Sequence, residues 1–117
     1  MYPNSTLFAG IKVSDFKAAV PWYEQLLGAP AFQPHETEMV WEVGQGSFIY
    51  INESPGAGSS MVTLFLDDLD AAAREISGRG LEPAESETYS NGVRKLTYRD
   101  PDGNEIGFGG APSEAEA

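Results

Sequence analysis

Residues 99–108 read Arg-Asp-Pro-Asp-Gly-Asn-Glu-Ile-Gly-Phe, and this stretch predicts a tight turn between two β-strands. Pro101 fixes φ near the value that a turn needs, and Gly103 supplies the position where φ is positive. The flanking residues alternate in polarity and are rich in β-formers, which is typical of a hairpin. We therefore expect a closing hairpin in which a strand over residues 105–108 ends the fold.

The chain before this hairpin contains the same pattern twice. Residues 7–13 and 61–66 each predict a strand, and each strand leads to an acidic N-cap, Asp15 or Asp68, and then to an apolar stripe at helical spacing. Three extended segments follow each helix: 31–35, 39–43 and 47–52 in the first copy, and 82–87, 93–99 and 105–108 in the second. This repetition predicts an internal duplication of a strand–helix–three-strand unit.

The domain organisation follows from this repeat. A chain of 117 residues is long enough for one domain with a real core. The segment 53–60 is rich in Ser, Gly and Pro and predicts a flexible connection. We therefore place a single domain over residues 1–110, with modules at about 5–54 and 60–110, and expect an acidic flexible tail over 111–117.

Composition excludes several classes of function. The net charge of −11 argues against nucleic acid and anionic membranes as partners, and it favours cationic ligands over anionic ones. The absence of cysteine excludes disulfides, thiolate metal sites and cysteine nucleophiles. No secretory signal and no apolar run of membrane-spanning length are visible, so we expect a cytoplasmic protein without a membrane partner.

The paired strand–helix–three-strand units and the terminal Asp100–Asn104 turn together resemble the vicinal oxygen chelate superfamily, over about residues 7–108. This superfamily holds glyoxalase I, extradiol dioxygenases, fosfomycin-resistance enzymes and bleomycin-resistance proteins. The resemblance implies an α+β fold in which two tandem βαβββ modules form a curved, half-barrel mixed sheet with helices on its outer face.

Strand alternation predicts which side chains line the concave face of that sheet. Residues 9, 11 and 13 form an apolar row that should meet the helix, so residues 8, 10 and 12 take the other face. The same reasoning for the other strands gives a set of apolar and aromatic candidates for ligand binding: Phe8, Phe48, Tyr50, Met61 and Phe65, with Trp41 and Tyr98 as neighbours. Glu105 is the acidic candidate on this face, and its alternative interpretation is a solvent-exposed residue after a turn.

The resemblance also implies where a metal would be bound. In the metal-dependent members, the ligand positions correspond here to Phe8, Met61, Gly107 and most closely Tyr50. Divalent ions need imidazole or oxygen donors, which Phe, Met and Gly do not supply. We therefore predict no metal and no cofactor, and we assign no catalytic residue. The only histidine, His35, is interpreted as a solvated surface residue.

Three hypotheses of function remain open. The first is a small-molecule-binding protein similar to the bleomycin-resistance proteins, in which the resemblance implies a homodimer that completes the groove. Its ligand would be flat or cationic, because aromatic faces bind such molecules by stacking and cation–π attraction. The second is a metal-dependent lyase or dioxygenase with an atypical site built from Glu105, Tyr50 or His35, so enzymatic activity stays open. The third is a regulatory domain whose pocket is vestigial.

Overall fold

The computed structural model describes residues 1–112, and within them two helices and eight strands form an α+β fold. The element order is β1 (Leu7–Val13), α1 (Phe16–Leu27), β2 (Phe32–His35), β3 (Glu38–Gly44), β4 (Ser47–Glu53), β5 (Met61–Leu66), α2 (Leu69–Gly78), β6 (Glu85–Thr88), β7 (Arg94–Arg99) and β8 (Glu105–Gly110). Of the predicted tail, Ala111 and Pro112 are exposed, and residues 113–117 lie outside the described part of the chain.

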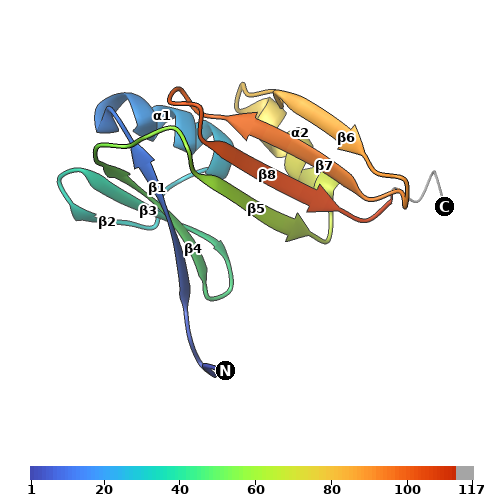
Figure 1. The fold of residues 1–117 in the computed structure, drawn as a ribbon, viewed down its shortest axis with the longest axis horizontal. Helices are drawn as coiled ribbons and strands as arrows, with labels where there is room; N and C mark the ends of the chain where they lie inside the picture. The colour runs from blue at the N-terminus through green and yellow to red at the C-terminus, as the bar shows by residue number, and fades with distance from the viewer. Residues whose placement is uncertain (113–117) are drawn as a thin grey trace.

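The strands form two four-stranded mixed sheets with the same topology. Their orders are β1-β4-β3-β2 and β5-β8-β7-β6. Strand β1 runs parallel to β4, and β5 runs parallel to β8. The remaining neighbouring pairs are antiparallel. Both sheets are open (Figure 1), so the first and last strands of each keep a free edge. The repeated topology confirms the prediction of two tandem βαβββ modules.

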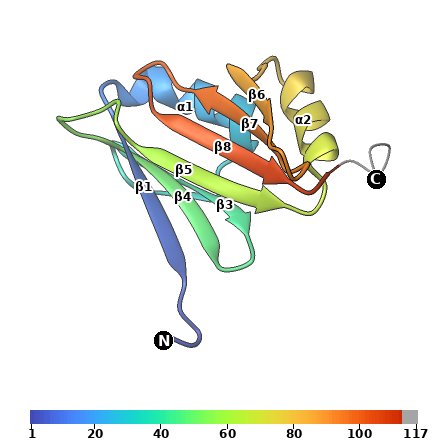
Figure 2. The same ribbon diagram turned by 45° about the vertical axis from the view of Figure 1, so that its right-hand side comes forward.

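Each helix covers one face of its own sheet and begins at the predicted cap. Asp15 accepts a hydrogen bond from the backbone N–H of Ala18, and Gly28 ends α1 with φ 86°. Helix α1 contacts β3 and β4, α2 contacts β8, and the two helices touch each other. Figure 1 shows α2 behind the strands of the second sheet, and Figure 2 shows it beside that sheet, next to β6. The opposite face of each sheet is therefore left uncovered by helix.

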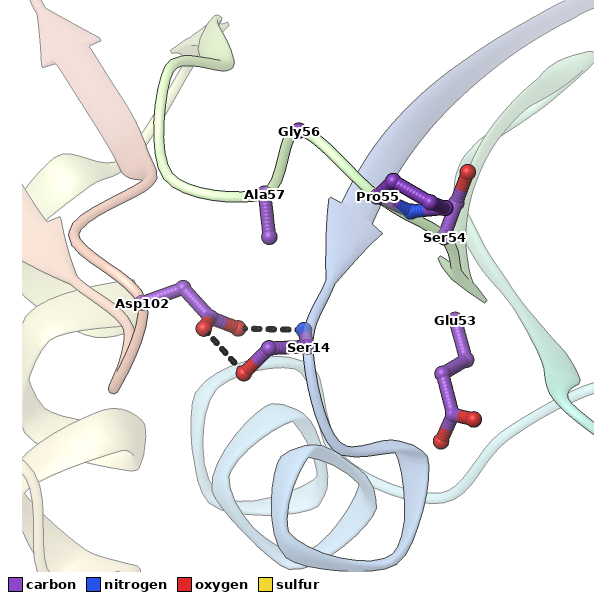
Figure 3. Close-up of a pocket in the computed structure, with 7 residues that line it drawn as sticks. All are labelled: Ser14, Glu53, Ser54, Pro55, Gly56, Ala57 and Asp102. Carbon is purple, nitrogen blue, oxygen red and sulfur yellow. Dashed lines mark hydrogen bonds between the residues drawn. The ribbon is translucent and has the colours of Figure 1, made fainter.

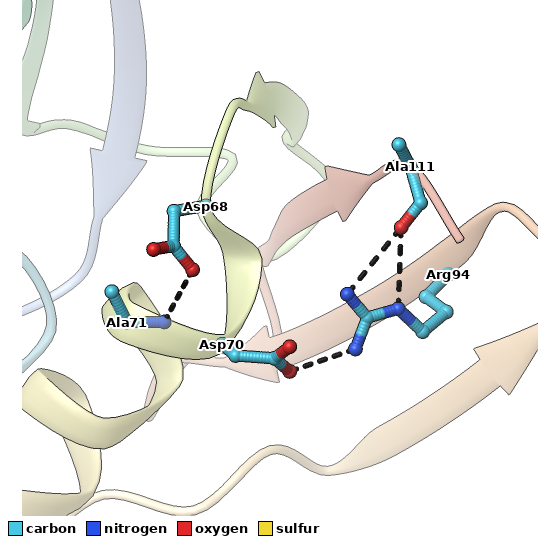
Figure 4. Close-up of polar contacts among 5 residues, drawn as sticks. All are labelled: Asp68, Asp70, Ala71, Arg94 and Ala111. Atoms are coloured by element: carbon cyan, nitrogen blue, oxygen red, sulfur yellow. Dashed lines mark hydrogen bonds and ion pairs between the residues drawn. The ribbon is translucent and has the colours of Figure 1, made fainter. Parts of the chain in front are cut away.

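Arg94 on β7 connects helix α2 to the end of strand β8 in the second module. Its guanidinium lies 2.7 Å from the Asp70 carboxylate in the first turn of α2, and it also donates to the Ala111 carbonyl (Figure 4). Hydrogen bonding to Arg94 holds the pKa of Asp70 below its usual value. Asp68 caps α2 by accepting from the Ala71 N–H. These contacts tie the helix start to the end of the sheet.

The core lies between the helices and the sheets, and it includes two of the predicted site residues. Trp41 is fully buried, pairs in register with Ile49, and donates from Nε1 to the Gly28 carbonyl at 2.9 Å. Tyr98 is 1% exposed and packs edge-on against Phe108 at a ring separation of 5.7 Å. Both side chains face the helices, so neither lies on the uncovered face.

The turn at residues 100–104 joins the two modules. Asp100 is buried, and its carboxylate accepts from the Tyr23 hydroxyl on α1 at 2.7 Å as well as from the backbone N–H groups of Asp102 and Asn104. Burial, and then the hydrogen bond to Asp100, raises the pKa of Tyr23 above its ordinary range. One carboxylate of the second module therefore anchors the helix of the first.

Asn104 extends this connection to β1 and to the segment that links the modules. It is fully buried and donates from Nδ2 to the Lys12 carbonyl and to Asp100. Its Oδ1 accepts from the backbone N–H groups of Gly58 and Ser60 at 3.1 and 2.9 Å. Because every polar atom of this amide is used, Asn104 fixes the linking segment against both modules.

Neither helix in residues 1–112 has the length and apolar character that a bilayer-spanning helix requires. The cytoplasmic location stays a prediction from the sequence.

Candidate functional site

The uncovered face of the first sheet carries an aromatic cluster. Phe8 and Phe48 are paired in register on neighbouring strands, and their rings stack with a centroid separation of 4.7 Å and an interplanar angle of 10°. Tyr50 meets Phe8 edge-on at 6.5 Å. Phe8 remains 47% exposed, although its ring is apolar. Three of the predicted site residues therefore come together on the face that alternation predicts.

A glycine makes room for this cluster. Tyr50 is paired with Gly10 on β1, and a Cβ built on Gly10 would lie 2.6 Å from the Tyr50 hydroxyl oxygen and ring carbon Cζ. The ring therefore lies across the bare backbone of β1. A cavity of about 270 Å³ adjoins it, and its lining residues are Gly10, Ile11, Lys12, Tyr50, Asn52 and Ser54.

The uncovered face of the second sheet has a different character. Met61 and Phe65 on the edge strand β5 are 69% and 67% exposed. They are paired in register with Glu105 and Gly109 of β8, so this strand presents one acid and two glycines, at 107 and 109. Large apolar side chains thus lie on the edge strand β5, and the neighbouring strand β8 has two glycines on the same face.

Glu105 is not a free acid. Its carboxylate lies 3.0 Å from the Arg99 guanidinium, which also binds Glu85 at 2.9 Å. Hydrogen bonds to Glu85 and then to Glu105 raise the pKa of Arg99. An acid held by an arginine in this way is available to a ligand only if the ion pair opens.

The residues that the resemblance assigns to the superfamily's metal positions supply few donor atoms. Phe8, Met61 and Gly107 offer no nitrogen or oxygen side-chain donor, and Tyr50 offers a single phenol oxygen. Within residues 1–112 no three His, Cys, Asp or Glu side chains lie close enough to share an ion. His35 is exposed on β2, where its Nδ1 is 3.2 Å from the Thr37 backbone nitrogen and hydroxyl oxygen. The donor set present therefore does not fit the usual ion of this superfamily.

An apolar groove lies between the modules and was missed by alternation. Its volume is about 280 Å³, and it brings Phe48 of the first module and Phe65 of the second to one hollow. The other lining residues are Leu7, Ala9, Val43, Gly44, Ser47, Ile49, Val62, Thr63, Leu64 and Leu66. The β5 residues 62, 64 and 66 are the ones predicted to pack on a helix, but they are only half-buried, which leaves the groove open.

A hollow of about 440 Å³ lies at the linking segment and is lined by Ser14, residues 53–57 and Asp102 (Figure 3). Its two acids already serve the backbone. Asp102 accepts from the N–H and hydroxyl of Ser14, and Glu53 accepts from the Phe16 N–H at 3.0 Å. We therefore interpret this hollow as part of the connection between modules and not as the binding site.

Comparisons with known proteins agree with this geometry. A sequence model described as a glyoxalase-like domain matches residues 9–108. A glyoxalase/bleomycin resistance protein from Catenulispora acidiphila is 56% identical, with a TM-score of 0.89 over 93% of this chain and 100% of that one. A comparison with curated protein sequences found no match.

Two more distant structures share the fold. A bleomycin-binding protein in complex with bleomycin is 21% identical, with a TM-score of 0.72 over 95% of this chain and 100% of that one. A lactoylglutathione lyase from Agrobacterium tumefaciens is 16% identical, with a TM-score of 0.71 over 92% of this chain and 94% of that one. The same fold thus occurs in a protein with a bound drug and in a protein described as an enzyme.

Proposed function

Because this chain belongs to the glyoxalase-like group of the vicinal oxygen chelate superfamily, we propose that it binds a flat, aromatic small molecule, an antibiotic or a metabolite, without the usual metal of the superfamily. The observation that carries this proposal is the groove of about 280 Å³ with a phenylalanine from each module. Concave, mostly apolar hollows with a few polar groups are where proteins bind small molecules. The complex of a structural neighbour with bleomycin supports the same reading of the fold.

The aromatic residues supply the affinity in this proposal. An aromatic ligand in the groove would contact Phe48, whose outer neighbour Phe8 already stacks on it, and Phe65 on the opposite side. Aromatic contacts contribute about 0.5–1.5 kcal/mol beyond the burial of their area. A ligand held by both modules would therefore lose much of its affinity when either ring is removed.

Calorimetric titration with 2-naphthamide, a neutral aromatic probe, tests this proposal. We expect saturable binding that weakens about tenfold in Phe48→Ala and in Phe65→Ala, because each removes one aromatic wall. Tyr89→Ala is the matched control, since Tyr89 is exposed but does not line the groove. Equal affinity in all three variants would show that the probe binds elsewhere, and the absence of saturation would overturn the proposal.

Metal analysis of the purified protein separates this function from the metal-dependent alternative. A lyase or dioxygenase of this superfamily would retain a divalent ion, and such an ion would raise the melting temperature by mass action. Stoichiometric bound metal would overturn the metal-free part of the proposal and lead to lyase and dioxygenase assays.

We also propose that the chain forms a homodimer through the edges of its sheets. Leu7 and Met61 are 66% and 69% exposed, and they lie on β1 and β5, each of which is an edge strand of its sheet. Exposed apolar side chains on a free sheet edge mark an association surface. Light scattering should give the mass of a dimer, and Met61→Lys should shift it toward the monomer more than Tyr89→Lys does. A monomer at all concentrations would contradict the proposal.

A further inference from the structure

Lys95 stands apart among the lysines of this acidic protein. Lys12 and Lys17 are exposed, whereas Lys95 on β7 is half-buried. Within residues 1–112 no carboxylate lies within 4.0 Å of its ammonium group. The directly opposite residue on β6 is Glu87, and even this acid makes no ion pair with it. Its ammonium group is therefore not engaged by a carboxylate of the described residues and is available to an anion from outside.

The side chain of Lys95 is laid across the uncovered face of the second sheet. A Cβ built on Gly107 would lie 2.8 Å from Lys95 Cε, 3.6 Å from its Nζ and 3.2 Å from the Thr63 hydroxyl oxygen. Only a glycine at 107 leaves this path free. The Lys95 side chain therefore extends from β7 across β8, and its ammonium group points toward Thr63. Thr63 is one of the residues that line the groove.

A second glycine, Gly109, lies under an aromatic ring on the same face. Phe65 and Lys95 both pair in register with Gly109, from opposite sides. A Cβ at 109 would lie 3.2 Å from the Phe65 ring, so the ring rests on this glycine while the other ring face remains open. Residues 107 and 109 share one face at a spacing of about 7 Å. The Lys95 ammonium and the Phe65 ring therefore lie over successive glycines, 107 and 109, on one face of the sheet.

We propose that Lys95 recognises an acidic group of the ligand, so that the molecule bound in the groove is an aromatic carboxylate or phosphate. The inference rests on the proposed function and names the ligand's charge. The net charge of −11 favours cations at long range, but salt screens that field beyond about 10 Å. A charge in contact with the ligand is screened far less, and ammonium groups bind carboxylate and phosphate oxygens strongly.

The test compares probes that share one ring system. We expect 2-naphthoate or 2-naphthyl phosphate to bind at least about tenfold more tightly than neutral 2-naphthamide at physiological ionic strength, since a charge-assisted hydrogen bond replaces a neutral one. The phosphate and the carboxylate arms distinguish the two acids. Lys95→Met should remove the preference without weakening the amide, and Lys17→Met, which removes the same charge from the exposed face of α1, should keep it.

A second variant keeps the lysine and moves it. Gly107→Ala places a methyl group 2.8 Å from Lys95 Cε, which must then shift, so the preference should fall about threefold while the charge is unchanged. Equal or tighter binding of the amide, or a preference that survives Lys95→Met, would overturn the inference and leave the groove proposal standing. If none of the three probes saturates, both proposals fall.

Discussion

The turn before the last strand differs between the two modules, although their topology is the same. In the first module residues 44–46 join β3 to β4. Outside its own hairpin, this turn accepts a hydrogen bond at the Gly46 carbonyl from the Leu7 N–H of β1. In the second module residues 100–104 join β7 to β8 and bond to β1, α1 and the linking segment. The first turn bonds within its own module, whereas the second turn holds the two modules together.

The uncovered faces of the two sheets also differ, in the side chains that they present. The first sheet presents stacked aromatic rings, and the second presents two glycines crossed by a lysine and a phenylalanine. The two copies of the unit therefore use glycine between different strand pairs: Tyr50 of β4 lies over Gly10 of β1, whereas Lys95 of β7 lies over Gly107 of β8. The comparison teaches that the turn connecting the modules and the proposed charge recognition belong to the second module, and the stacked aromatic surface belongs to the first.

The largest effect should come from breaking the connection that only the second module has. We expect Asn104→Ala to lower the free energy of unfolding by about 3 kcal/mol, because the Gly58 and Ser60 N–H groups and the Lys12 carbonyl lose a buried partner. Urea unfolding measures this. Asn91→Ala is the control, since Asn91 is an exposed turn residue that accepts one hydrogen bond, from the Val93 N–H. An equal loss in the two variants would show that the connection contributes no special stability.

A matched pair of buried tyrosines, one in each module, gives the next effect. Tyr23 donates to the Asp100 carboxylate, so Tyr23→Phe should lower the free energy of unfolding by about 2 kcal/mol. The Tyr98 hydroxyl is buried without a hydrogen-bond partner among the described residues, so Tyr98→Phe should be neutral or stabilising by about 1 kcal/mol. Thermal unfolding of both variants decides the matter, and equal losses would contradict the difference between the two hydroxyls.

The same tyrosines predict an alkaline limit to stability. Burial and the bond to Asp100 raise the pKa of Tyr23, and burial raises the pKa of Tyr98, from the ordinary value of 10.0. Above that pH the unfolded chain releases protons that the folded chain keeps, so stability is intact below pH 10.0 and falls above it. Each group contributes a slope of about 1.4 kcal/mol per pH unit. Tyr23→Phe should flatten this decline, and an unchanged slope would contradict the assignment.

The sequence predicts the elements well because their signals are local. The spacing of apolar residues and the caps at Asp15 and Asp68 place both helices, and β1 and β5 begin and end where alternation predicts. The turn at 100–104 is predicted as a hairpin, but its role as a connection is not. That role depends on contacts with residues about 90 positions away, such as the hydrogen bond of Ser14 to Asp102, for which |i−j| is 88.

The candidate site is predicted only in part, for a related reason. Alternation within a strand gives two faces but not which face of β3 or β7 meets the helix. Trp41 and Tyr98 are therefore predicted beside the site, whereas the register pairs them with Ile49 and Ile106 of the core. The same register places Lys95 on the uncovered face. The sequence feature that could have indicated this role of Lys95 is the pair of glycines at 107 and 109 in β8. Alternation within each strand does not show that Lys95 of β7 lies beside them.

The smallest effect sharpens the comparison of the two uncovered faces. Gly10→Ala would bring a methyl group within 2.6 Å of the Tyr50 ring and displace it, because the ring end is free to move. We expect less than about 1 kcal/mol of lost stability and about threefold weaker binding of 2-naphthamide, since the aromatic cluster of the first sheet loses its order. Gly78→Ala is the control, because its new Cβ would meet no atom within 4 Å and Gly78 does not line the groove. Equal affinities in the two variants would mean that the ligand is held by Phe48 and Phe65 without help from Tyr50, and the first module would then contribute a single ring to the site.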